Sequence, residues 1–91
     1  TLHIEHEISD FTTWRNAFDR FAAVCAQSGV LAERVQRPAD DENYVVLQLD
    51  FAEARQATSF LRFLEQNVWS TPANSPALVG SPSARVLETV R

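Results

Sequence analysis

The chain has 91 residues, 45% of them hydrophobic, and a net charge of −4, which suits one small globular domain and argues against a basic nucleic-acid groove. All eight basic residues are arginine, so the chain excludes Schiff-base lysine chemistry and a phosphate-binding P-loop lysine. The single cysteine excludes an internal disulfide, and no apolar run reaches the ~18 residues of a membrane span, so we expect a cytoplasmic protein.

Residues 2–8 alternate between apolar and polar side chains, which predicts a half-buried strand. The Ser9-Asp10 pair predicts the start of a helix, because a short side-chain oxygen can accept a free backbone N–H there. The helix then ends before Gly29, which can adopt a left-handed conformation. Its apolar stripe has helical spacing and consists of Phe11, Trp14, Phe18, Phe21, Ala22 and Cys25.

Residues 30–37 and 43–51 predict two strands, joined by a short connection of hairpin length. Asp50 and Glu53 are candidates for the capping box of a second helix. Phe63 lies about 160° from Leu61 on that helix, so we expect residues 70–82 or a partner chain to cover it. The apolar stripe of the second helix consists of Ala54, Ala57, Leu61, Leu64 and Val68.

Residues 70–82 contain three prolines and one glycine and predict a loop, which is either a lid over a pocket or a passive connection. Residues 83–90 predict a final strand. The resulting order, β-α-β-β-α-β, predicts one ferredoxin-like α+β domain over residues 1–91. In that fold a four-stranded antiparallel sheet carries both helices on one face.

Three stretches together resemble a known group of proteins: EISDFTTWRNAFD, ADDENYVVLQLDF and SPSARVLETV. They are similar to the small dimeric α/β-barrel proteins of the antibiotic-biosynthesis-monooxygenase-like and polyketide-cyclase-like group. The resemblance implies a homodimer paired sheet to sheet, with a pocket between sheet and helices. The asparagine and histidine of the haem-degrading members have no counterpart, so haem degradation is not expected. By alternation, the open sheet face carries His3, Glu5, Glu7, Tyr44, Val46, Gln48, Arg85 and Leu87.

The opening HxxH pattern raises the question of a metal site. On a strand, His3 and His6 point to opposite faces and cannot bind one metal ion together, so we expect no metal site. His3 with Glu5 or Glu7 and a third ligand from a neighbouring strand is the alternative.

His6 lies on the apolar face and has two interpretations. It is either a core histidine bonded to a protein partner or a pocket histidine that acts as a general base or hydrogen-bond donor. We expect it to pack near Trp14 or Phe18 and treat it as the candidate catalytic residue. Trp14, Phe18 and Tyr44 are the candidate pocket residues, and Cys25 is expected to be buried and unreactive.

Two functions are consistent with these features. One is a cofactor-independent monooxygenase or cyclase acting on a flat apolar or polyketide-like small molecule. The other is a non-catalytic dimer that binds a small apolar ligand or has a structural role, which the sparse polar content of the helix-facing strands favours. We expect no cofactor, no nucleic-acid partner and no membrane contact.

Overall fold

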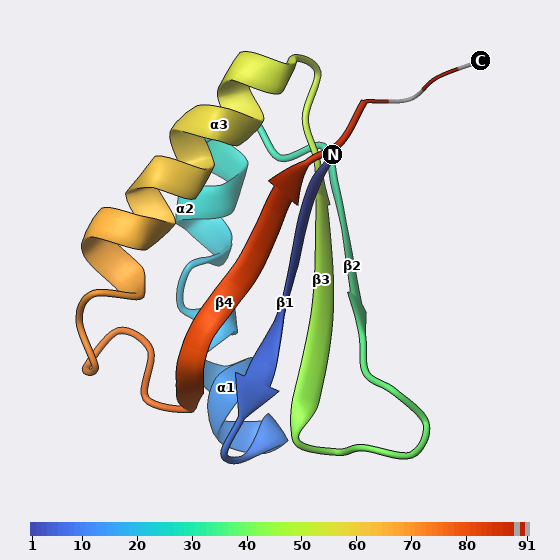
Figure 1. Cartoon of the computed structure of the whole chain (residues 1–91). Helices are drawn as coiled ribbons and strands as arrows, with labels where there is room; N and C mark the ends of the chain where they lie inside the picture. Colours follow the sequence, from blue (N-terminus) through green and yellow to red (C-terminus); the bar gives the residue numbers. More distant parts are fainter. Residues whose placement is uncertain (89, 91) are drawn as a thin grey trace.

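The computed structural model describes residues 1–88 and residue 90. Its strands form one four-stranded antiparallel sheet in the order β2-β3-β1-β4. The helices lie on one face of this sheet, so the chain has an α+β architecture, as predicted (Figure 1). The elements are β1 (Leu2–Ile8), α1 (Phe11–Asp19), α2 (Ala22–Gln27), β2 (Ala32–Gln36), β3 (Tyr44–Asp50), α3 (Ala54–Phe63), the π-helical turn η1 (Leu64–Val68) and β4 (Leu78–Val86).

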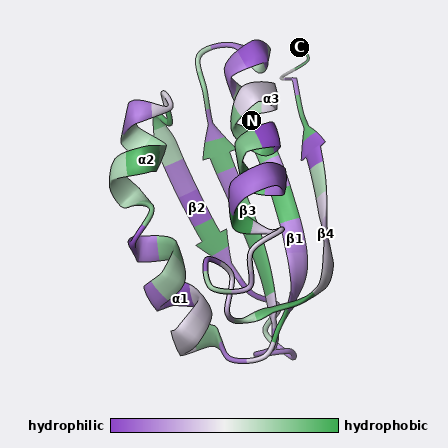
Figure 2. Cartoon of the chain, turned by 90° about the vertical axis from the view of Figure 1, so that its left-hand side faces the viewer, coloured by the Kyte–Doolittle hydropathy of each residue, from purple (hydrophilic) through white to green (hydrophobic). Residues whose placement is uncertain are grey.

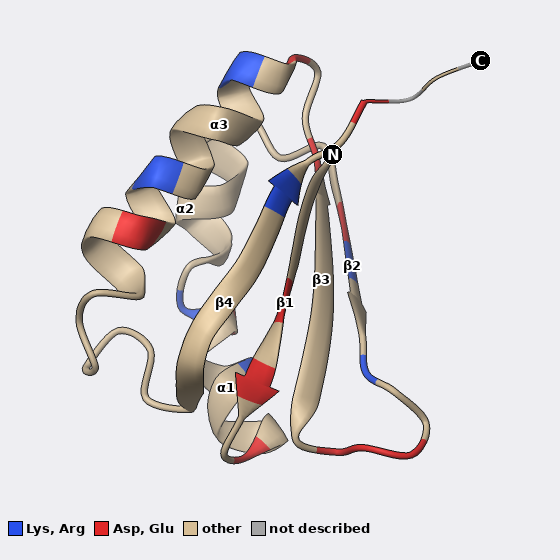
Figure 3. Cartoon of the chain, in the orientation of Figure 1, with Lys and Arg blue, Asp and Glu red and all other residues tan. Residues whose placement is uncertain are grey.

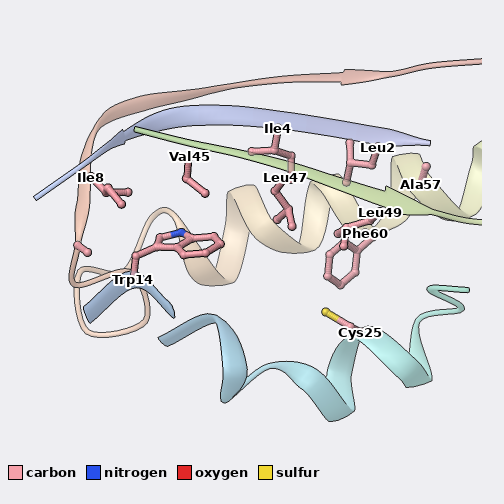
Figure 4. Close-up of a cluster of buried hydrophobic side chains, with 11 residues drawn as sticks. Leu2, Ile4, Ile8, Trp14, Cys25, Val45, Leu47, Leu49, Ala57 and Phe60 are labelled. Atoms are coloured by element: carbon pink, nitrogen blue, oxygen red, sulfur yellow. The ribbon is translucent and has the colours of Figure 1, made fainter. Parts of the chain in front are cut away.

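The core lies between the sheet and the helices. The inward residues of β1 and β3 alternate with outward ones, as the two-residue period of a strand requires. Figure 4 shows these side chains directed at the helices, where they meet Trp14, Cys25, Ala57 and Phe60. In Figure 2 the helices lie in front of the sheet with hydrophilic and hydrophobic segments alternating along them, as in amphipathic helices.

The first predicted helix is present but is interrupted. Asp10 is its N-cap and accepts the backbone N–H of Thr13 at 2.8 Å, and Gly29 follows its end with φ of +94°, as predicted. The chain between Asp19 and Ala22 departs from the α-helix, and the N–H of Phe21 bonds to Phe18 O, three residues back. This tighter turn separates α1 from α2 while both remain on the same face of the sheet (Figure 1).

The second predicted helix begins with a different cap. Its N-cap is Glu53, whose backbone N–H bonds to the side chain of Gln56, whereas Asp50 accepts the hydroxyl of Thr1. The prediction that Asp50 caps this helix is therefore wrong, because β3 continues through Asp50 and keeps it on the sheet.

The inward face of α3 is centred on Ala57 and Phe60 rather than on Leu61, which is only partly buried. Phe63, three residues after Phe60, therefore lies beside it, with ring centroids 5.9 Å apart, and is partly buried. The prediction placed Phe63 on the back of the helix, and this placement is wrong because Phe60 was left out of the stripe.

The last strand begins earlier than predicted. Leu78 already pairs with Ile8, so the connection after η1 is residues 69–77, the closing segment, and not 70–82. Gly80 and Pro82, which predicted a loop, lie in β4 because this is an edge strand with an irregular register. The described strand ends at Val86, and position 89 of the predicted strand lies outside the described residues.

Candidate functional site

A cavity of about 60 Å³ lies between the sheet and the helices. Apolar side chains of every surrounding layer form most of its wall. They include Ile4 of β1, Leu47 of β3, Trp14 and Phe18 of α1, and Phe60 of α3. A cavity of this size holds a few water molecules in its present form.

His6 is the polar group of β1 that borders this cavity, and only 6% of it is exposed. Its Nδ1 lies 3.0 Å from the carbonyl oxygen of Glu7, and since a carbonyl can only accept, Nδ1 carries the proton. In neutral His6 the other nitrogen, Nε2, is then a free acceptor. Nε2 has no hydrogen-bond partner among the described residues. No side-chain nitrogen or oxygen of these residues is both fully buried and unpaired, so Nε2 is not fully buried. Nε2 therefore keeps some accessible surface, and the His6 side chain lines the cavity.

An aromatic ring of α1 lies beside the histidine and stacks on a second ring. The centroids of His6 and Trp14 are 6.3 Å apart, which confirms the predicted packing, and Trp14 stacks on Phe18 at 5.2 Å with nearly parallel planes. Both aromatic residues line the cavity. These rings form a flat apolar wall beside the imidazole.

The pairing of β1 with β4 is interrupted at His6. Glu5 pairs with Ser83 and Glu7 with Val79, so more residues of β4 than of β1 lie between the two pairs. Gly80 lies in this irregular part and adopts a φ of +69°, which favours glycine. Bulges of this kind are common beside functional sites, where they redirect a side chain.

Burial shifts the pKa values of the two titratable side chains that line the cavity, His6 and Cys25, in opposite directions. It lowers the pKa of His6 from its ordinary 6.5, and the hydrogen bond to Glu7 opposes this only in part, so the imidazole is neutral at pH 7. Burial, and then the negative charge of Glu33, raises the pKa of Cys25, which is therefore a protonated thiol. Cys25 is buried, as predicted.

The closing segment forms one end of the cavity with Asn74, Ser75 and Ala77. Hydrogen bonds hold it in place: Ser9 N–H donates to Ala77 O at 2.9 Å, and Asn74 Nδ2 donates to Asn67 O at 2.8 Å. The segment thus lies where a lid would lie.

Tyr44 does not belong to this cavity. The neighbouring Val45 and Leu47 face the core, so Tyr44 points to the open face of the sheet, where its hydroxyl donates to Glu5 Oε1 at 2.7 Å. Its inclusion among the pocket residues is corrected by the alternation of β3, which places it on the opposite face.

A chain of hydrogen bonds crosses the open face over β2, β3 and β1. Arg34 Nη1 donates to Gln48 Oε1 at 3.2 Å, Gln48 Nε2 to His3 Nδ1 at 3.1 Å, and His3 Nε2 to Glu5 Oε2 at 2.9 Å. The bonds from His3 and then Tyr44 lower the pKa of Glu5, and the bond to Glu5 raises the pKa of Tyr44. Figure 3 shows acidic and basic segments along these strands.

His3 and His6 lie on opposite faces of the sheet, as predicted. His3 pairs with Glu5, but in residues 1–88 and 90 no group of three or more His, Cys, Asp or Glu side chains could hold a metal ion.

Trp69 and η1 belong to the cavity wall but were not among the predicted pocket residues. Leu64, Val68 and Trp69 all line the cavity. Trp69 falls outside an α-helical stripe drawn through Leu64 and Val68, and it enters the wall only because the helix ends in a π-helical turn. Helical periodicity carries no signal for such a turn.

No family model, curated protein or solved structure matches the chain. None of the helices in the described part of the chain has the length and apolar character needed to cross a bilayer.

We predict that His6 makes stability dependent on pH. Its pKa is lower in the folded protein than in the unfolded chain, so the unfolded chain binds more protons between the two values. The stabilisation is fully present above about pH 6.5 and is lost as the pH falls through the folded pKa. Denaturant midpoints from neutral pH to about pH 5 should fall less in His6→Gln than in the wild type. Equal slopes in the wild type and His6→Gln would contradict this role of His6.

Proposed function

We propose that the protein binds a small, flat, mostly apolar molecule in the cavity and acts on it by proton transfer to His6, without a cofactor. The observation that supports this most is the free Nε2 of a neutral imidazole at a mostly apolar cavity. The resemblance to monooxygenase-like and polyketide-cyclase-like proteins favours the same class of chemistry.

The proton transfer requires only what the cavity holds. A phenol or enol hydroxyl, or an acidic C–H beside a carbonyl, gives its proton to Nε2, and the ring becomes an imidazolium whose other proton stays on Nδ1. The substrate becomes an enolate or phenolate. Proton abstraction of this kind begins both cofactor-independent oxygenation and ring closure of a polyketone. The aromatic wall of Trp14 and Phe18 would hold a flat ring beside the imidazole.

The alternative is a dimer that binds a small ligand or has a structural role without catalysis. A specific observation favours it: the titratable side chains lining the cavity in the described residues are His6 and a protonated Cys25. A single base without an oriented acid serves binding as readily as catalysis. The volume of about 60 Å³ also lies far below the ~300 Å³ at which common ligand pockets begin.

We also propose that the chain is a ferredoxin-like domain that forms a homodimer through its open sheet face. The strand order β2-β3-β1-β4 and the placement of the helices on one face support this fold. The open face carries the hydrogen-bonded chain from Arg34 to Tyr44, with Val46 partly buried and Leu87 exposed. Such a surface fits a polar interface with a small apolar centre.

The free, buried Cys25 supports a cytoplasmic location.

We predict that the wild type discriminates between two probes of equal shape, phenol and toluene. Only phenol can donate a hydrogen bond to Nε2, so His6→Phe should lower the ratio of phenol to toluene affinity about tenfold, since an unpaired buried hydroxyl costs about 1–3 kcal/mol. Affinities follow from calorimetry or NMR titration. Toluene controls for the shape of the cavity, and failure of both probes to bind the wild type would refute the ligand site.

Deuterium exchange separates catalysis from binding. The wild type should accelerate deuterium uptake at the acidic C–H positions of cyclohexanone in D₂O, His6→Gln should not, and His3→Gln should behave as the wild type. Phenol binding without accelerated exchange would favour the non-catalytic alternative.

We predict a dimer in sedimentation velocity experiments at micromolar concentration. Val46→Glu places an unpaired charge at the centre of the open face and should yield monomers. Ala23→Glu adds the same charge on the exposed surface of α2 and should leave the dimer intact. A monomeric wild type at high micromolar concentration would rule out the dimer.

A further inference from the structure

The end of α3 departs from α-helical geometry beside the cavity. In η1 the N–H of Trp69 donates to Leu64 O at 2.7 Å, a bond that spans five residues instead of four. In a continuous α-helix Trp69 would lie about 140° around the axis from Leu64. With the five-residue bond the two side chains lie on the same side of the helix, and both line the cavity.

Side chains in η1 and just after it bond to carbonyl groups at the start of this turn and within it. Asn67 Nδ2 donates to Phe63 O at 3.3 Å, and Ser70 Oγ donates to Gln66 O at 2.6 Å. A change in helical hydrogen bonding leaves carbonyls that need other partners, and these two polar side chains supply them. The sequence around Trp69 therefore stabilises the π-helical turn.

The closing segment holds the same turn from the other side. Asn74 Nδ2 donates to Asn67 O at 2.8 Å, and Asn74 itself lines the cavity. Trp69 is thus the residue at which η1 ends and the closing segment begins, and it remains partly exposed.

The volume of the cavity shows why this position matters. A dry cavity of about 150 Å³ accepts benzene, so a cavity of about 60 Å³ admits one ring only if its wall moves, and a fused pair of rings requires a larger movement. Ile4 and Leu49 in the sheet are almost completely buried and are fixed by the strand ladders. Trp69, in contrast, is a large side chain of the wall that lies at the end of an element.

We propose that Trp69 determines the size of the ligand: the π-helical turn holds its indole in the cavity wall and restricts the site to one hydroxylated aromatic ring. Conversion of η1 to an α-helix would move the indole out of the wall and admit a fused ring. The proposal rests on the ligand site proposed above, to which it adds the ligand class and the residue that limits it.

The experiment compares phenol with 2-naphthol, which carries the same hydroxyl on two fused rings. Their affinities are measured for the wild type and for Trp69→Ala. The wild type should prefer phenol, and Trp69→Ala should shift the ratio toward 2-naphthol by at least about tenfold. Phe63→Ala is the matched control, since it removes an aromatic ring from α3 that does not line the cavity, and it should keep the wild-type ratio.

Two further variants keep the test decisive if Trp69→Ala fails to fold. Trp69→Phe keeps an apolar side chain in the wall but a smaller one. Asn74→Ala removes the hydrogen bond between the closing segment and η1 while the indole remains. Both variants should shift the affinity ratio toward 2-naphthol. An unchanged ratio in the folded Trp69 variants, with phenol still bound, would overturn the role of Trp69 and leave the ligand site standing. Absence of binding by both probes to every variant would refute the site itself.

Discussion

The hydrogen bond from Nδ1 of His6 to the carbonyl of Glu7 is the constraint on which the candidate site depends. A carbonyl has no proton to give, so this bond places the single proton of the neutral imidazole on Nδ1 and leaves Nε2 as an acceptor. Burial keeps the ring neutral by lowering its pKa. The backbone of β1 thus determines which nitrogen faces the cavity and in what chemical form, a role that carboxylates or carbonyls have beside many functional histidines.

The surrounding structure keeps this acceptor available. The irregular register between β1 and β4 leaves His6 without a paired residue in β4, and Trp14 and Phe18 supply apolar contact without competing hydrogen bonds to Nε2. On the far side of the cavity, η1 places Leu64 and Trp69 in the wall. In the proposed site, an acceptor in a small apolar space would select a ligand by one donated hydrogen bond and by the size of its ring.

The strands and helices were predictable where one physical signal dominated. Alternation located β1 and β3 and separated His3 from His6, and Asp10 and Gly29 marked the ends of the first helical region. The proximity of His6 and Trp14 followed from the short turn at Ser9 and the rise of a strand and a helix.

Other features depend on tertiary context. Gly80 and Pro82 are turn residues in most settings, but an edge strand with an irregular register accepts both, so β4 begins at Leu78. The π-helical turn is specified by side chains bonding to carbonyls, among them Ser70 to Gln66, and the hydrophobic period does not record such bonds. Trp69 therefore had no sequence signal as a cavity residue, and the partner of His6, a backbone carbonyl, has no residue type to detect.

The protonation state of the His6 ring is the most direct test of the proposed site. In uniformly ¹⁵N-labelled protein at neutral pH, two-bond ¹H–¹⁵N correlation spectra distinguish the two tautomers from each other and from the imidazolium, and His6→Gln assigns the signals. We expect a neutral ring with the proton on Nδ1 and an Nε2 resonance that shifts when phenol is added. A proton on Nε2, or an imidazolium at neutral pH, would contradict it.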